Sequence, residues 1–553
     1  GEVNKSGLVT MLKDQTGDMA VMIRFQEQVS VFRATIPLGI PTENFPIVKN
    51  FIDEKVFNKL KTLGLPSSEI CDDTTFLRRT AIDIAGRLPS LQEVEAFFSN
   101  DHSEKRSQWI DSLLSTTDHA EYFSNKWAAI LRNKRKGNTY TRGTQAFHEW
   151  LMKSLHANKP YNQLITELVT ARGEISHNPA SAWFRNVTDP KERLQDTAQV
   201  LLGVRLQCAE CHHHPYEKWS QQDYYGFSAF FSRIGKKKTD VPGEEAVFHN
   251  VGLATAKNPK SGENVKPKPL GGDELIIKPE DDPRLDLASW MTSESNPFFA
   301  KMLVNRYWKH FFNRGIVEPE DDMRVTNPPT NPDLLDSLAE HFVKSGYDLK
   351  DLIRTICNST TYQLSAIPND HNAGDRQNYS RYFPKRLTAE VLLDSIDGIT
   401  GSSTAFSGQL AGTRAVALPD DSYNSSSYFL TVFGRPEMDS ACECERAQGA
   451  SLAQTLHLLN SKNIQDKLAG SGGSADKLSS QADRANEEKI VELYKRAFSR
   501  EPKDDEMKTA IEYINKKTQQ AKEDAGKINE ANKMAYEDLV WALLNTKEFL
   551  FNH

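Results

Sequence analysis

A chain of 553 residues is longer than one hydrophobic core usually organises, which predicts two or three domains. Apolar residues make up 38% of the chain and the formal net charge is -7, a composition that is typical of folded globular proteins and excludes a disordered chain or a coiled coil. The sequence holds neither the basic patch of a nucleic-acid-binding protein nor the run of about 18 apolar residues that spans a membrane.

Residues 19–37 predict a β-hairpin, because apolar and polar residues alternate in two runs around the polar segment Gln-Glu-Gln. Two strands alone are marginally stable in water, so we expect further strands from a missing N-terminal part of the same polypeptide or from neighbouring copies. The chain also begins at Gly1, from which we expect that an upstream segment has been removed. Residues 1–45 are therefore interpreted as the C-terminal end of a larger β module.

The rest of the sequence predicts a mainly α protein with two helical domains. Amphipathic stretches joined by short polar turns fill residues 46–234 and again residues 285–553. Residues 235–284 are rich in Lys, Gly and Pro, which indicates an extended crossing with two strand-like pieces, at 246–252 and 274–279. The clearest helix is predicted over 297–314, with Asn296 as its cap and Gly315 at its end.

The segment 207–219 contains the pattern Cys-x-x-Cys-His. With six Cys and 14 His in the chain, about 0.002 accidental matches are expected. The spacing is that of c-type haem attachment, in which two thiols hold the porphyrin edge and the next imidazole binds iron. It predicts one covalent haem c on Cys208 and Cys211, with His212 as the proximal ligand. A zinc or iron–sulfur site and a plain disulfide are the alternatives, although no second Cys-x-x-Cys or His pair is present.

The neighbouring segments fit a haem site. Asp189 and Pro190 predict the start of a helix whose end comes just before the motif. An aromatic run follows the motif, and Trp219 and Tyr225 within it are candidate walls for a flat apolar cofactor, although a place in the core is the plainer interpretation for most of the run.

The sequence resembles the paired planctomycete-specific cytochrome-like and C-terminal domains of large secreted planctomycete and verrucomicrobial proteins. The resemblance spans about residues 46–553 and rests on residues 51–90, 208–231, 296–342, 352–365 and 442–461. It implies a secreted setting and the domain frame given above. In longer members of the family, sequence similar to residues 1–45 closes an immunoglobulin-like module, so the resemblance implies that these residues are the end of such a module. The cytochrome-like name of the family depends on the same Cys-x-x-Cys-His motif, so it is not independent support for haem.

The resemblance points to further site residues. His310 matches a family histidine and is the candidate distal iron ligand, with a core or surface role as the alternative. Met302, Met323 and Met438 are weaker candidates, because Met usually fills gaps in cores. His214, followed by Pro, also matches a family pattern, and it would either act as acid or base beside the haem or hold the structure by hydrogen bonds. We expect the haem at the junction of the two helical domains.

Cys71, Cys442 and Cys444 fit the family pattern, whereas Cys357 is interpreted as a small buried residue. Thiols tend to pair outside the cytoplasm, but the pairing among these four stays open, and a direct Cys442–Cys444 bond would be strained. A reactive thiolate near Arg446 is one alternative. A surface ion pair between Arg446 and its neighbouring glutamates is another.

Three functions stay open for this chain. The first is a mono-haem protein that exchanges electrons with a redox partner, and the second is a haem oxidoreductase acting on an extracellular substrate such as carbohydrate. The third is a structural or assembly protein with an incidental haem. Signatures of nucleotide-binding enzymes, serine hydrolases and zinc proteases are missing. Because this kind of haem attachment normally occurs outside the cytoplasm, we expect an extracytoplasmic protein, either periplasmic or secreted.

Overall fold

The computed structural model describes residues 2–11, 16–25, 28–135, 140–185, 187–242, 244–425, 427–441, 446, 449, 451–521 and 525–553. These residues form two compact units. The first takes its residues from 1–70, 130–383 and 440–442, and the second takes them from 71–129, 384–439 and 443–553. Neither unit is one continuous stretch of sequence, so each core is assembled from segments that lie far apart in the chain.

The first unit is built mainly from helices. They are α1 (Phe51–Leu63), α6 (Thr141–His156), α7 (Tyr161–Val169), η2 (Pro179–Phe184), α8 (Pro190–Thr197), η3 (Ala198–Leu202), η4 (Gln207–Glu210), α9 (Gln221–Ala229), α10 (Pro283–Met291), α11 (Phe299–Phe312), α12 (Pro332–Lys344) and α13 (Leu349–Asn358). Helix α11 is almost entirely buried and packs against α12, α13 and η3, so it is the central element of this core.

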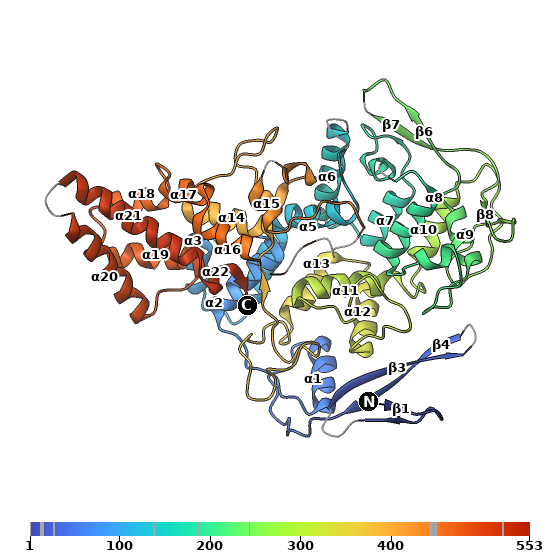
Figure 1. Ribbon diagram of the computed structural model, residues 1–553, viewed down its shortest axis with the longest axis horizontal. Helices are drawn as coiled ribbons and strands as arrows, with labels where there is room; N and C mark the ends of the chain where they lie inside the picture. Colours follow the sequence, from blue (N-terminus) through green and yellow to red (C-terminus); the bar gives the residue numbers. More distant parts are fainter. Residues whose placement is uncertain are drawn as a thin grey trace. The chain divides into compact units, whose positions relative to one another are not determined.

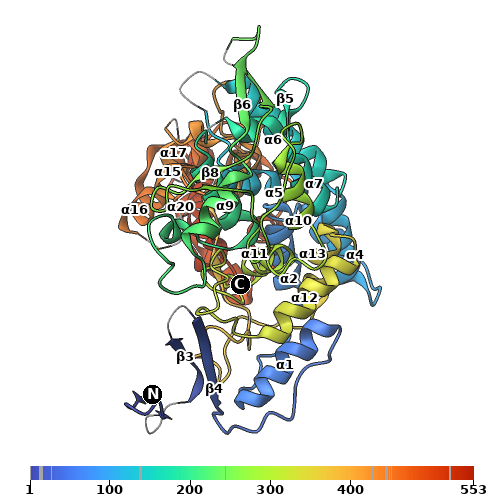
Figure 2. The same ribbon diagram turned by 90° about the vertical axis from the view of Figure 1, so that its right-hand side faces the viewer.

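The predicted N-terminal hairpin is confirmed. Strand β3 (Gly17–Phe25) pairs antiparallel with β4 (Gln28–Ile36), and Gly17 lies opposite Ile36. Figure 2 shows the two strands as one ribbon beside α1, where Lys59 forms an ion pair of 2.6 Å with Asp18. Several large apolar side chains of the ribbon are exposed to solvent: Met22, Ile23, Phe25 and Phe32.

The remaining strands of the first unit are short. They are β1 (Glu2–Val3), β2 (Val9–Thr10), β5 (Gly173–Glu174), β6 (Ile234–Lys238), β7 (Glu245–His249), β8 (Ala256–Lys257) and β9 (Asn264–Val265). Strand β7 lies between β5 and β6 in a three-stranded sheet, so the first strand-like piece of the crossing is a strand. The second piece, 274–279, has no regular secondary structure, and its Ile276 is 89% exposed.

Helix α11 follows the predicted pattern with different ends. The Asn296 side chain accepts hydrogen bonds from the N–H groups of Phe298 and Phe299, at 2.9 and 3.0 Å, but the N-cap position is Phe298 and not Asn296 as predicted. The helix ends at Phe312, because Asn313 adopts a left-handed conformation with φ of 61°. Gly315, the predicted end, lies beyond that turn.

The second unit contains α2 (Asp73–Thr80), η1 (Ala81–Ala85), α3 (Leu91–Phe98), α4 (Lys105–Ser115), α5 (Thr117–Ile130), α14 (Ala389–Thr400), η5 (Ala415–Ala417), η6 (Asp421–Tyr423), α15 (Tyr428–Val432), α16 (Leu452–Asn460), α17 (Lys462–Ala469), α18 (Ser474–Ser480), α19 (Asn486–Phe498), α20 (Asp504–Gln520), α21 (Ala525–Leu544) and α22 (Lys547–Leu550). Strand β10 (Lys385–Arg386) pairs with β11 (Phe551–Asn552). Helix α3, blue in Figure 1, packs against the red helix α19 from the other end of the chain.

The mainly α fold with short antiparallel hairpins is therefore confirmed. Within the part of the chain that the structure describes, no helix is both long enough and apolar enough to cross a membrane.

Candidate functional site

The Cys-x-x-Cys-His motif follows the end of a long helical segment, as predicted. The Asp189 side chain accepts the N–H of Lys191 at 2.8 Å and begins α8, which continues as the π-helical turn η3. Gly203, with φ of 66°, then ends the helix. A Cβ atom at this position would lie 2.6 Å from Met323 Cγ and 2.9 Å from Met302 Sδ, so the close packing requires glycine.

The two cysteines of the motif lie on one turn at the surface. Cys208 belongs to the short 3-10 helix η4, and its carbonyl accepts hydrogen bonds from the N–H groups of Cys211 and His212, at 3.4 and 3.3 Å. Both cysteines are exposed and have free thiols. The turn therefore presents Cys208, Cys211 and His212 to solvent.

Glu210 fastens this turn to the helices on either side. Its carboxylate accepts hydrogen bonds from Lys191 Nζ at 2.9 Å and from the Tyr224 hydroxyl at 3.1 Å. Its carbonyl accepts the Gln221 side-chain amide at 2.9 Å and the Tyr225 hydroxyl at 3.4 Å. Tyr224 and Tyr225 are buried, so they hold the turn through these hydrogen bonds and do not present an exposed ring face to a cofactor.

His212 is held in the tautomer that a metal ligand needs. Its Nδ1 lies 2.7 Å from the carbonyl oxygen of His213, and because a carbonyl only accepts, Nδ1 carries the proton. A neutral ring then keeps its lone pair on Nε2. Metal-binding histidines usually donate their other ring N–H in this way, often to a backbone carbonyl. The exposed thiols and this histidine fit the attachment of a haem at the turn.

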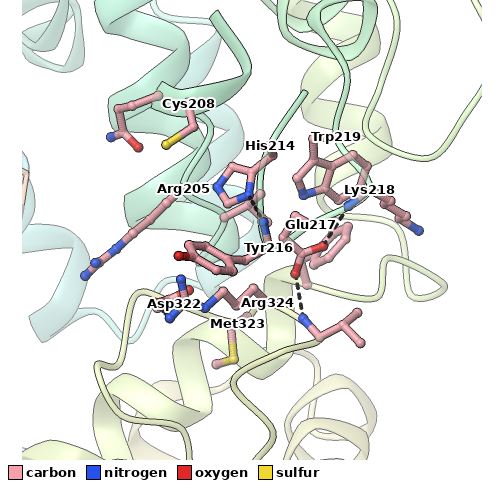
Figure 3. Close-up of a pocket in the computed structure, with 14 residues that line it drawn as sticks. Arg205, Cys208, His214, Tyr216, Glu217, Lys218, Trp219, Asp322, Met323 and Arg324 are labelled. Atoms are coloured by element: carbon pink, nitrogen blue, oxygen red, sulfur yellow. Dashed lines mark hydrogen bonds and ion pairs between the residues drawn. The ribbon is translucent and has the colours of Figure 1, made fainter. Parts of the chain in front are cut away.

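A pocket of about 260 Å³ lies next to the turn and is drawn in Figure 3. All of it belongs to the first unit. Its lining comes from two stretches with 78 residues between them: Val204, Arg205, Gln207, Cys208, His214, Tyr216, Glu217, Lys218 and Trp219 from the motif region, and Phe298, Asp322, Met323, Arg324 and Val325 from the region around α11. Cys208, one of the two motif thiols, thus borders a cavity with both polar and aromatic walls.

His214 is buried in this pocket, with 7% of its surface exposed. Its backbone N–H donates to the Trp219 carbonyl at 3.0 Å, and its Nδ1 accepts the N–H of Tyr216 at 3.2 Å. Nε2 therefore carries the proton of the neutral ring. Burial and the nearby positive charge of Arg324 lower the pKa of His214. His214 is a neutral hydrogen-bond donor at neutral pH, unlike His212, whose Nε2 is an acceptor.

Glu217 is the second buried titratable group of the pocket. Its two carboxylate oxygens accept the N–H of Val325 at 2.5 Å and the N–H of Lys218 at 3.3 Å. Burial raises the pKa of Glu217, in opposition to these two hydrogen bonds. The bond to Val325 also joins the motif region to the segment that follows α11.

That segment brings acidic and basic side chains to the pocket wall. Asp321 is buried and accepts hydrogen bonds from Arg205 and, at 2.5 Å, from the Gln199 side-chain amide. Asp322 is also buried and lies 3.4 Å from the Arg324 guanidinium, which stacks over the Tyr216 ring. The charges on this wall are therefore largely paired with one another.

Of the predicted aromatic walls, Trp219 lines the pocket and Tyr225 does not. The Trp219 ring meets Phe298 edge to face, with 6.2 Å between ring centres. Figure 3 shows Trp219 on the same side of the pocket as Lys218, with His214 between Trp219 and Cys208.

His310 does not line this pocket. It lies near the end of α11, whereas Met302 in the first half of that helix packs against Gly203. Eight residues separate the two, which is about 12 Å along a helix axis. Met323, a weaker candidate for the distal iron ligand, does line the pocket, together with Cys208.

Of the other four cysteines, two are buried and two lie outside the described residues. Cys71 is a buried free thiol in the second unit, and Cys357 is buried on α13. Cys442 and Cys444 lie outside the described residues. Arg446 forms a two-pronged ion pair with Glu390, at 2.7 and 3.1 Å, and Glu390 also lies 3.4 Å from the buried Arg435. Arg446 thus takes part in a buried ion-pair network.

Among the described residues, no group of three or more His, Cys, Asp or Glu side chains is arranged to hold a metal ion. A structural zinc site needs four such ligands.

Sequence reasoning missed several pocket residues, namely Arg205, Glu217, Asp322 and Arg324. For Asp322 and Arg324 the only signal was the run of consecutive carboxylates followed by Met and Arg at 320–324, a pattern that also occurs in ordinary helix caps, and no pattern marked Arg205 or Glu217 as pocket residues. Only the fold shows that this run lies against the cysteine motif.

Two family models match the chain, each described as a protein of unknown function. The PSCyt2 model (DUF1549) matches residues 51–236, and the PSD1 model (DUF1553) matches residues 283–514. No curated protein and no solved structure matches the chain significantly. The matched segments meet in the pocket, because one supplies Cys208 and the other supplies Met323. The chain therefore belongs to the planctomycete-type proteins that pair a PSCyt2 domain with a PSD1 domain, a family of unknown function.

Proposed function

We propose that this chain is a mono-haem c-type protein that transfers electrons outside the cytoplasm. One observation carries the proposal: two exposed free thiols at the attachment spacing stand beside an exposed histidine whose Nδ1 is bound to a carbonyl. Cys208 and Cys211 would hold the haem through thioether bonds, and His212 Nε2 would bind its iron. Bound haem would supply one-electron redox chemistry.

The attachment needs no further reactant. Each thiol adds its sulfur and its hydrogen across one vinyl double bond of the porphyrin, so no atom is lost and no oxidant is consumed. The chain contributes position, because Glu210 and its partners fix the turn that carries both thiols. An exposed turn also lets the thiols react after the rest of the unit has folded.

The pocket favours a second candidate, a haem-dependent oxidoreductase. Cys208 borders a cavity in which His214 offers a proton on Nε2 and Glu217 is a buried carboxyl group. A small substrate in this cavity would lie beside the haem tether and within reach of both groups.

Two partners belong to this proposal. One is a soluble redox protein that docks at the exposed Cys208–His212 turn. The other is the N-terminal part of the same polypeptide, or a neighbouring copy, which would cover the exposed apolar side chains of the β3–β4 hairpin.

The test is the absorption spectrum of the chain made in a bacterium that exports it and attaches c-type haem. We expect haem that stays with the protein after acid–acetone extraction and the reduced spectrum of a haem with two thioether bonds. Cys208→Ser and Cys211→Ser should each shift that spectrum to the form with one thioether bond. Cys71→Ser, which removes a free thiol in the second unit, should leave it unchanged.

Cyanide distinguishes the two candidates. An electron-transfer haem with both axial positions filled resists cyanide, whereas an oxidoreductase with an open position binds it and changes its spectrum. A chain whose haem is removed completely by acid–acetone contradicts both.

A further inference from the structure

We propose that the second unit carries a binding site for a neutral, polyhydroxylated ligand such as a short oligosaccharide, in a pocket formed by α14 and the loop that follows it, the start of α15, α16 and α17. The site lies entirely in the second unit and does not depend on haem. The elements around it are the orange helices in Figure 1.

The pocket has a volume of about 670 Å³, which is within the range of small-ligand sites. Its walls are rich in hydroxyl groups and contain few aliphatic side chains. The loop after α14 supplies Ser402, Ser403, Thr404, Ala405, Phe406 and Ser407, and the other elements supply Leu393, Ser427, Tyr428, Phe429, His457, Asn463, Asp466 and Lys467. Hydroxyl and amide groups both donate and accept, which suits a ligand with many hydroxyl groups.

The hydroxyl-bearing loop is fixed before any ligand arrives. One oxygen of Asp397 accepts the Ser402 hydroxyl at 2.8 Å, and the other accepts the backbone N–H and the hydroxyl of Thr404 at 2.9 and 2.7 Å. Lys467 is paired with Asp397 and donates to the Thr404 hydroxyl at 2.8 Å. Because the loop is already ordered, little conformational entropy is lost when a ligand binds.

The charges of the pocket are balanced within the protein. Buried Lys467 is paired with Asp397, and exposed Asp466 is paired with Lys462 at 2.8 Å. Burial lowers the pKa of His457, so this ring is neutral at neutral pH. A charged ligand would find no uncompensated opposite charge here, which favours a neutral one.

An aromatic side chain stands at the rim of the pocket. Tyr428 is 67% exposed, and its ring lies 5.4 Å from that of His457, which in turn contacts Phe429 and Phe433. A flat ring with a polar tip can pack against the C–H face of a sugar while neighbouring hydroxyl groups bind its edge. His457 also lines the pocket, and among the described residues its Nε2 is a buried atom without a hydrogen-bond partner.

Saturation-transfer NMR and titration calorimetry on the full chain test the proposal. The neutral probes are maltotetraose, cellotetraose and N-acetylchitotetraose, and the charged probe is trigalacturonate. We expect at least one neutral probe to bind. Tyr428→Ala should weaken that binding at least tenfold, and Ser407→Trp, which fills the pocket from an exposed position, should abolish it. Tyr428→Trp keeps the aromatic surface and should retain the binding.

The matched control is Leu410→Ala, which removes an exposed apolar side chain close to the loop but outside the pocket. It should leave the affinity unchanged. The proposal is overturned if no neutral probe binds at millimolar concentration, or if Tyr428→Ala and Ser407→Trp leave the affinity unaltered. Tighter binding of trigalacturonate that weakens with added salt also overturns it, because such binding requires an unbalanced positive charge.

Discussion

His212 and His214 are only two positions apart, yet the fold gives them opposite hydrogen-bonding roles. His212 is exposed and donates from Nδ1, so its Nε2 is free to bind a metal. His214 is buried and accepts at Nδ1, so its Nε2 donates into the pocket. Only the first arrangement suits an iron ligand, and only the second suits a proton donor to a bound molecule.

The pKa of His214 is a direct test of this environment. It should lie below the ordinary value of 6.5, because burial and Arg324 both disfavour the charged ring. Arg324→Gln should raise it, and Lys218→Gln, which removes another positive charge of the pocket lining, should leave it nearly unchanged. NMR titration of histidine-labelled chain measures all three values. A pKa at or above 6.5 in the unaltered chain would contradict the burial of His214.

A second prediction at the scale of residues concerns Glu390 and the stability of the fold at low pH. Although burial opposes it, Arg446 and Arg435 lower the pKa of Glu390 to about 2 from its ordinary 4.5. The ionised Glu390 carboxylate therefore contributes its full share of the free energy of unfolding above pH 4.5, and this contribution is lost as the pH falls towards 2. Glu390→Gln should cost about 3 kcal/mol at pH 7, because the shift of the pKa corresponds to that free energy.

The cost of Glu390→Gln should shrink steadily between pH 4.5 and 2, as measured by chemical denaturation at each pH. Glu340→Gln, which breaks the exposed pair with Lys344, is the control and should change stability little at any pH. A cost for Glu390→Gln that does not depend on pH would show that the ion pair does not set the pKa.

At the scale of elements, two helices in different units end in the same way, with a π-helical turn followed by a left-handed glycine. Helix α8 passes into the π-helical turn η3 and stops at Gly203, and α2 passes into η1 and stops at Gly86. Both glycines are left-handed, and both lie against a large side chain where a Cβ would collide. In the first unit this ending directs the chain into the cysteine turn.

Gly203→Ala should therefore destabilise the chain by about 2 kcal/mol, through a left-handed Cβ and its clash with Met302 and Met323. Because Met323 also lines the pocket, the variant should alter ligand access beside Cys208. Gly398→Ala is the control. It lies within α14 with open space around it, so alanine should stabilise the helix by about 0.5–1 kcal/mol. Thermal unfolding compares the two, and equal stabilities would refute the packing argument.

At the scale of the whole molecule, local patterns of the sequence predicted local structure well. Alternation predicted the hairpin, and Asp189 with Pro190 predicted the start of the helix before the motif. The pocket could not be predicted from local sequence patterns, because it forms where distant segments meet, as at the hydrogen bond between Glu217 and Val325. His310 does not line the pocket and Met323 does, because a sequence pattern does not show which residues around α11 lie near the cysteines. The role of His310 as distal iron ligand stays a prediction.

The hairpin carries a prediction about the whole molecule. Large apolar side chains of the hairpin are exposed, and its described contacts to the rest of the first unit include the Asp18–Lys59 ion pair and a hydrogen bond from Arg33 to the Pro329 carbonyl. In the chain alone, the amides of β3 and β4 should exchange with deuterium much faster than those of buried α11. Equal protection would mean that another segment or a second copy already covers the hairpin, and native mass spectrometry of the same sample would identify which.

The most direct test of the central claim is the intact mass of the chain under denaturing conditions, after export in a host that attaches c-type haem. The account predicts a mass equal to the polypeptide plus one haem, and a haem-bearing peptide that contains both Cys208 and Cys211. A mass equal to the unmodified polypeptide, from a host that attaches haem to a reference cytochrome c in the same culture, would contradict it.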